Sequence, residues 1–180
     1  MIKIIGIGNR MYGDDGVGPC LVSALKHCTE SIDTVQFIPL DLPNHGDIIH
    51  LGNSSLIVLV DSAVDEKTVL YKVDTDKVDL RELLELAQSS SGHGINPLSL
   101  IALAKIAGIL SNRQSIYLLL IGPLTPQFGT GLSKSAIREA IISLKKLENL
   151  IESHGQAFRY NEDCIREFLE NICRDPVNPL

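Results

Sequence analysis

Three short apolar runs of this chain lack the alternation of polar and apolar residues that a half-exposed strand shows. The runs are Met1–Ile7, Ser55–Val60 and Ser115–Ile121. Strands covered on both faces carry such continuous runs, and they are typical of parallel sheets with helices on either side. Segments with helical spacing of apolar residues stand between the runs. The sequence therefore predicts an α/β sandwich with a mostly parallel sheet.

Further segments complete the expected order of elements. A second strand is expected over Thr34–Leu40, with a short helical segment near Asp47–Leu51. Lys67–Val73 alternates, so we expect an edge strand with one face in water, for which an antiparallel direction is one possibility. Helices are expected over Val17–Lys26, Leu80–Ala87, Pro97–Ala107 after an Asn96 cap, the residues from a Ser133 cap to a stop near Gly155, and Asn161–Arg174.

Length and charge exclude several classes of protein. With 180 residues we expect one α/β domain over residues 1–160 and a helical extension with a loose tail over residues 161–180. The net charge of −6 and the absence of Trp argue against a nucleic-acid binder. The longest apolar runs, such as Ile116–Ile121, are too short to span a bilayer.

The four cysteines form no recognisable motif. Cys20, Cys28, Cys164 and Cys173 include no CxxC pair, and their spacing fits neither a zinc site nor a redox motif. We therefore expect unpaired thiols in a reducing cytosol, and hence a cytoplasmic protein.

Acidic and histidine side chains follow the expected strands at the points where these strands end. They are Asn9, Asp14 and Asp15 after the first strand, Asp41 and His45 after the second, Asp61 at the end of the third, and His93 in a glycine-rich loop. In a parallel α/β sheet, ligands bind outside the carboxyl ends of the strands. The sequence thus predicts a site at this edge.

Two ligands are in question for this edge. A dinucleotide fingerprint, GxGxxG, would need a glycine where Met11 follows Gly6 and Gly8, and adjacent acids would repel a phosphate. Carboxylates and an imidazole suit a divalent Zn, Ni, Mn or Fe ion, and ligand type does not choose among these metals. Each residue also has a structural interpretation: Asp14 or Asp15 as a helix cap, Asp61 as an acceptor of backbone hydrogen bonds, and His93 as a solvated loop residue.

The order of the short motifs resembles that of a known family, the hydrogenase maturation endopeptidases, which trim the large subunit of nickel–iron hydrogenases. The resemblance covers about residues 1–153. It rests on Gly6-Ile7-Gly8-Asn9, Gly13-Asp14-Asp15-Gly16-Val17-Gly18, Val60-Asp61-Ser62-Ala63, Gly92-His93-Gly94 and Gly131-Leu132-Ser133. The loop after the second strand departs from the family pattern, since Asp41-Leu42-Pro43-Asn44-His45-Gly46 lacks the usual glycines.

The resemblance implies a fold and a set of roles. The fold would be a three-layer sandwich with a twisted five-stranded sheet, one antiparallel edge strand and helices on both faces. Asp15, Asp61 and His93 would be the catalytic metal ligands, and Asn9, Asp14 and Asp41 would support them. His45 would be an extra ligand or a surface residue, and we favour the surface.

The implied activity is that of an aspartyl-type, metal-dependent endopeptidase. It would remove the C-terminal extension of a hydrogenase large-subunit precursor, whose own nickel, or another divalent metal, would meet the three ligands. Asp14 or Asp41 would then be candidates for a general base. We expect a monomer that neither enters a membrane nor binds nucleic acid. A nucleotide- or nucleoside-binding enzyme on a related sheet and a non-catalytic, metal-checking chaperone stay open as alternatives.

Overall fold

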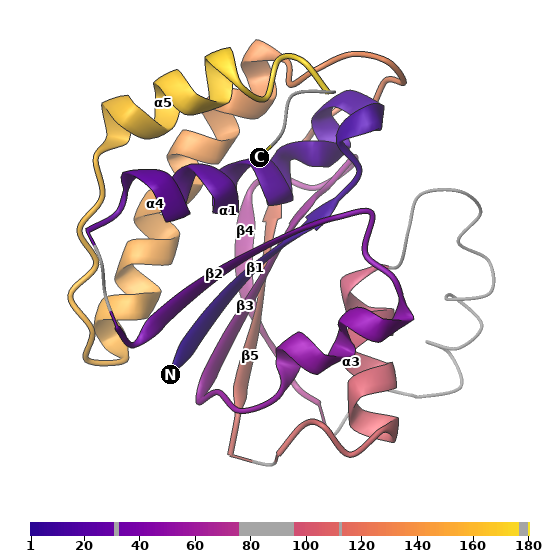
Figure 1. Ribbon diagram of the computed structural model, residues 1–180, viewed down its shortest axis with the longest axis vertical. Coiled ribbons are helices and arrows are strands. Elements are labelled where there is room, and N and C mark those ends of the chain that lie inside the picture. Colours follow the sequence, from indigo (N-terminus) through magenta and orange to yellow (C-terminus); the bar gives the residue numbers. More distant parts are fainter. Residues whose placement is uncertain (31–32, 76–95, 112, 177–179) are drawn as a thin grey trace.

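The protein is built on one five-stranded sheet (Figure 1). The computed structural model describes residues 1–30, 33–75, 96–111, 113–176 and 180. The strands are β1 (Ile2–Gly8), β2 (Val35–Asp41), β3 (Leu56–Ser62), β4 (Val69–Val73) and β5 (Ser115–Ile121), in the spatial order β2-β1-β3-β5-β4. Four strands are parallel, and the edge strand β4 runs antiparallel to β5. The predicted sheet and its antiparallel edge are confirmed.

Helices cover both faces of the sheet and make a three-layer sandwich. On one face lie α1 (Val17–Cys28), α4 (Lys134–Ser153) and α5 (Glu162–Asn171), and on the other lie η2 (His45–Leu51) and α3 (Pro97–Ile106) (Figure 1). A short 3-10 segment, η1 (Arg10–Gly16), joins β1 to α1. None of the helices in the described ranges is long and apolar enough to cross a membrane.

Side-chain caps set the helix boundaries where the sequence places them. The amide oxygen of Asn96 accepts a hydrogen bond from the Ser99 N–H at 2.8 Å, and Ser133 Oγ accepts one from the Ala136 N–H at 3.1 Å. Such caps each stabilise a helix by about 1 kcal/mol. The predicted starts of α3 and α4 are confirmed. The helix expected over Leu80–Ala87 lies outside the described residues.

Two glycines let α1 approach the sheet closely. A Cβ on Gly18 would lie 2.3 Å from the Ile7 carbonyl oxygen and 2.4 Å from that of Val60, so α1 crosses between β1 and β3 at backbone contact. Gly8 has a φ of +154°, and a Cβ there would lie 1.9 Å from the Asp15 carbonyl oxygen. The backbone after β1 can therefore turn back on itself directly below the acidic residues.

The cysteines are paired, so the expectation of unpaired thiols is wrong. Cys20 is bonded to Cys173 and Cys28 to Cys164, with Cα–Cα distances of 6.1 and 5.8 Å. The partners are 153 and 136 residues apart in sequence, so no local spacing signals them. They meet because α5 packs along α1, in the same apolar core as α4. Both bonds fasten the C-terminal segment to α1.

Candidate functional site

The connections of β1 and β3 create a crevice-forming position at the carboxyl edge of the sheet. The crossover from β1 to β2 passes through α1 on one face, whereas that from β2 to β3 passes through η2 on the other. Such a reversal beside the central strand is where ligands bind in open α/β sheets. Gly8 pairs with Asp41 on β2 and Gly6 with Val60 on β3, so Asp41 and Asp61 flank the end of β1.

Asp15 and Asp61 are drawn together by Ser62. The Ser62 hydroxyl donates to Asp15 Oδ1 at 2.9 Å, and the Ser62 N–H donates to Asp61 Oδ1 at 2.8 Å. The Asn9 N–H holds the other oxygen of Asp15, Oδ2, at 3.0 Å. One residue at the end of β3 thus orients both carboxyl groups.

The electrostatics of this acid pair favour a cation or a shared proton. Burial and the negative charge of Asp15 raise the pKa of Asp61 to about 8, and the hydrogen bond from the Ser62 N–H opposes this shift only in part. Two carboxylates in one partly buried place cannot both ionise cheaply. At neutral pH the pair therefore holds a proton that a divalent cation could replace.

Asp14 points into a structural contact with α4. Its Oδ1 accepts from the Ser133 N–H at 2.7 Å and its Oδ2 from the Ser133 hydroxyl at 2.9 Å, and the side chain is 5% exposed. Ser133 is itself the N-cap of α4. Asp14 thus fastens η1 to the start of α4 and places its negative charge at the positive end of that helix.

Asn9 and Asp41 shape the turn around the acid pair. The Asn9 amide oxygen accepts from the Met11 N–H at 3.0 Å, and Asp41 Oδ1 accepts from the Arg10 N–H at 3.0 Å. The buried guanidinium of Arg10 donates to the Asp175 carbonyl oxygen at 3.0 Å. Burial lowers the pKa of Arg10, and the charges of Asp41 and Asp175 counteract this.

The structure therefore brings together part of the predicted site. Asp15 and Asp61 share one place, and Asn9 supports Asp15 as expected. His93 lies outside the described residues, and within the described ranges no group of three or more His, Cys, Asp or Glu side chains could hold a metal ion. His45 is exposed at the start of η2. The three-ligand site stays a prediction.

Sequence reasoning did not single out Ser62, Ser133 or Arg10. Ser62 and Ser133 stand within the short motifs that carry the resemblance, beside Asp61 and at the predicted cap of α4. Arg10 follows Asn9 directly, but nothing in its spacing indicates that a cation is buried there. Its partner Asp175 is 165 residues away, which only the fold could show.

Solved structures with a similar fold have closely related descriptions. The hydrogenase maturating endopeptidase HybD from E. coli aligns with a TM-score of 0.63 at 17% identity, over 90% of this chain and 98% of that one. An endopeptidase from Escherichia coli, solved in solution, aligns with a TM-score of 0.65 at 16% identity, over the same shares of the two chains. A hydrogenase maturation protease, HycI from Thermococcus kodakarensis, aligns with 0.51 at 22%, over 94% and 92%.

These likenesses establish the fold. No family model matches the sequence. The comparison with curated proteins gives no match either. With 16 to 22% identity, the shared sheet and helices are shown, and the activity has to be argued from the site.

Proposed function

We propose that this chain is an endopeptidase that removes the C-terminal extension of a nickel-loaded hydrogenase large-subunit precursor. The acid pair carries the proposal, because Asp15 and Asp61 converge at the carboxyl edge of the sheet with one proton's worth of excess repulsion. The fold shared with maturation endopeptidases supports the same activity.

The nickel belongs to the substrate in this proposal. Asp15 and Asp61 would supply carboxylate oxygens and His93 an imidazole nitrogen, a donor set that suits a divalent transition metal. The cation would offset the repulsion that raises the pKa of Asp61. Such an ion can polarise a scissile carbonyl or lower the pKa of a water molecule. Asn9 and Ser62 hold Asp15 in the orientation that the ion would meet.

The general base is better sought in Asp41 than in Asp14. Ser133 donates to both oxygens of Asp14, which is buried and serves the packing of α4. Asp41 is exposed at the end of β2, beside the end of β1, and uses one oxygen to accept from the Arg10 N–H. Asp41 can therefore exchange protons with solvent near the acid pair.

Incubation with purified precursor tests the activity. Nickel-loaded and nickel-free large-subunit precursors are each mixed with the protein, and mass spectrometry follows loss of the C-terminal peptide. We expect cleavage of the nickel-loaded form alone. Equal processing of both forms would refute nickel recognition, and processing of neither would refute the endopeptidase.

Variants of the acid pair separate catalysis from metal checking. Asp15→Asn and Asp61→Asn should each slow cleavage by about 100-fold or more, the usual cost of removing a group that stabilises developing charge. Asp65→Asn, an exposed acid in the loop after β3, is the control. If both site variants cleave as fast as the control, a non-catalytic metal-checking role gains support instead.

A further inference from the structure

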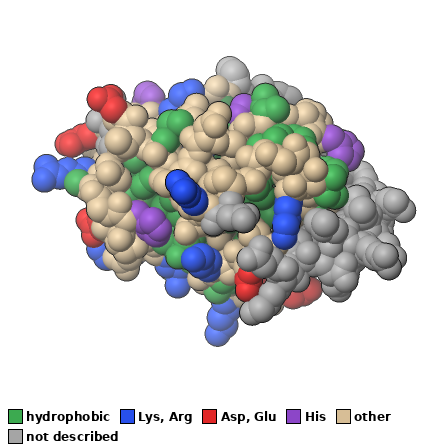
Figure 2. All heavy atoms as spheres, turned by 90° about the horizontal axis from the view of Figure 1, so that it is seen from below, with side chains coloured by type: hydrophobic (Ala, Val, Ile, Leu, Met, Phe, Trp, Pro, Cys, Tyr) green, Lys and Arg blue, Asp and Glu red, His purple; other side chains and the backbone are tan. Residues whose placement is uncertain are grey.

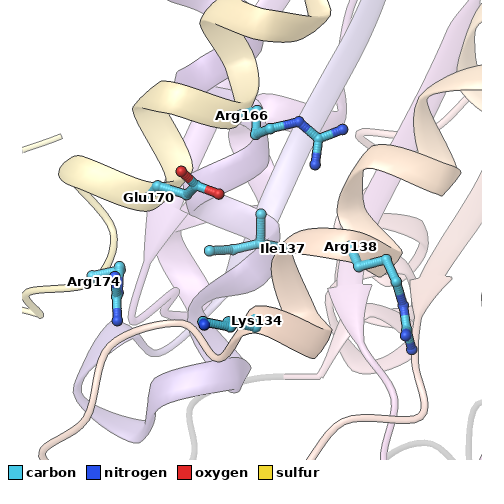
Figure 3. A pocket seen from close by; sticks show the side chains of 6 residues that line it. All are labelled: Lys134, Ile137, Arg138, Arg166, Glu170 and Arg174. Atoms are coloured by element: carbon cyan, nitrogen blue, oxygen red, sulfur yellow. The ribbon is translucent and has the colours of Figure 1, made fainter.

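A basic pocket lies between α4 and the C-terminal segment (Figure 3). Its volume is about 410 Å³, and it is lined by Lys134, Ile137, Arg138, Arg166, Glu170 and Arg174. Ile137 is buried and lies between Arg166 on α5 and Lys134 on α4. The lining thus combines an apolar floor with charged walls from two helices.

The charge of this pocket is opposite to that of the protein. Four of the 16 Lys and Arg residues of the chain line it, but only one of the 22 Asp and Glu residues does, on a chain with a net charge of −6. Arg166 pairs with Glu162 at 3.0 Å and Arg138 with Glu139 at 3.4 Å. Such exposed pairs contribute little and exchange easily with an incoming carboxylate.

The pocket adjoins the loop that carries the acid pair. Lys134 directly follows Ser133, which holds Asp14, the neighbour of Asp15. α4 begins at the end of the sheet where η1 lies (Figure 1). Because the Asp14 carboxylate already occupies the N-terminus of α4, attraction of an anion would come from the Lys and Arg side chains.

We propose that this pocket binds an acidic segment of the protein substrate, so that the inference rests on the proposed function. Carboxylates of the segment would meet Lys134, Arg166 and Arg174, while its aliphatic parts contact Ile137. Glu170 points into the same space and disfavours a compact multivalent anion such as phosphate (Figure 3). The chain's own C-terminal residue, Leu180, lines a different pocket beside Lys26.

Peptide binding tests the pocket without any cleavage. The probe is a fluorescein-labelled dodecapeptide with aspartate at every second position, and its twin carries asparagine instead. Fluorescence anisotropy is recorded with the wild-type protein, Lys134→Gln/Arg174→Gln and the control Lys146→Gln, an exposed lysine elsewhere on α4. We expect the aspartate peptide to bind at least tenfold more tightly than its twin, and the double variant to lose about tenfold, as two exposed ion pairs would.

Each outcome decides the inference. Equal binding of the two peptides, or equal loss in the control and the double variant, would overturn it. Displacement by sodium phosphate beyond that by sodium chloride of equal ionic strength would also overturn it, in favour of a site for small anions. Far-ultraviolet circular dichroism confirms that the variants are folded.

The result is independent of the proposed function. Cleavage of the nickel-loaded precursor without peptide binding would refute the pocket and leave the endopeptidase standing. Peptide binding without cleavage would refute the endopeptidase and leave an acidic-peptide site. If both hold, the double variant should raise KM for the precursor and leave kcat unchanged, because the pocket is apart from Asp15 and Asp61.

Discussion

Replacing Asp61 with asparagine should change how the stability of the protein depends on pH. The pKa of Asp61 is raised from 3.8 to about 8 in the folded protein, first by burial and then by the charge of Asp15. Between these pH values the folded state keeps a proton that the unfolded state has lost. The free energy of unfolding therefore falls as pH rises, by up to about 1.4 kcal/mol per pH unit.

Asparagine has a similar shape and no proton to lose. Asp61→Asn should therefore gain stability over the wild type as pH rises, by up to about 2.7 kcal/mol between pH 5 and pH 7. Asp15→Asn removes one of the two causes of the raised pKa, so it should flatten the wild-type slope only in part. Asp65→Asn removes an exposed charge in the next loop and controls for the change in net charge.

Urea denaturation at half-unit steps from pH 4.5 to pH 8.5, with the disulfides intact, measures these free energies. A carboxyl-detected NMR titration of Asp61 gives its pKa directly. If the difference in stability between Asp61→Asn and the wild type stays constant across this range, Asp15 and Asp61 do not compete for ionisation. The argument for a cation at the pair would then be lost.

Three further predictions concern the scaffold of the site. Ser133→Ala removes the N-cap of α4 and both partners-by-side-chain of the Asp14 contact except the backbone N–H, so urea denaturation should show a loss of about 1–2 kcal/mol; an unchanged midpoint would contradict this. Gly18→Ala puts a Cβ 2.3 Å from the Ile7 carbonyl oxygen and should destabilise the fold by about 3 kcal/mol in the same assay, whereas a wild-type value would show that α1 can shift away from the sheet. Dithiothreitol should lower the melting temperature, because each long-range disulfide typically contributes about 2–4 kcal/mol, and a Cys20→Ala/Cys173→Ala variant should melt between the oxidised and reduced forms.

Much of the fold could be predicted because its signals are local. Continuous apolar runs marked β1, β3 and β5, and alternation marked β4 as the edge strand that it is. Caps at Asn96 and Ser133 marked the starts of two helices. These features depend on neighbouring residues only, and the same physics acts on them before and after folding.

The pairing of the cysteines could not be predicted from such local signals. The bonds join α1 to the segment around α5, and their positions follow from how α5 packs in the core. The cytoplasmic location was inferred from unpaired thiols, so the two disulfides remove that support. Structural disulfides persist mainly in oxidising compartments, and in the cytosol chiefly of hyperthermophiles.

The site shows the same division between local and distant causes. The rule that ligands bind at the carboxyl ends of strands placed Asp15 and Asp61 at one edge, and the structure joins them through Ser62. The rule could not tell Asp14 from Asp15, because adjacent residues on a 3-10 turn face different ways. Their roles separate only when Ser133, 119 residues away, claims Asp14.

The acid pair is thus held by contacts that converge from the whole chain. Asp15 is fixed to β3 through Ser62, and Asp14, one residue before it, to α4 through Ser133. Arg10, at the start of the same turn, reaches the Asp175 carbonyl in the C-terminal segment, which the disulfides fasten to α1. Because η1 is anchored at three places, a shift of the C-terminal segment should reach Asp15 through Arg10. This makes that segment a support of the site as well as one wall of the basic pocket.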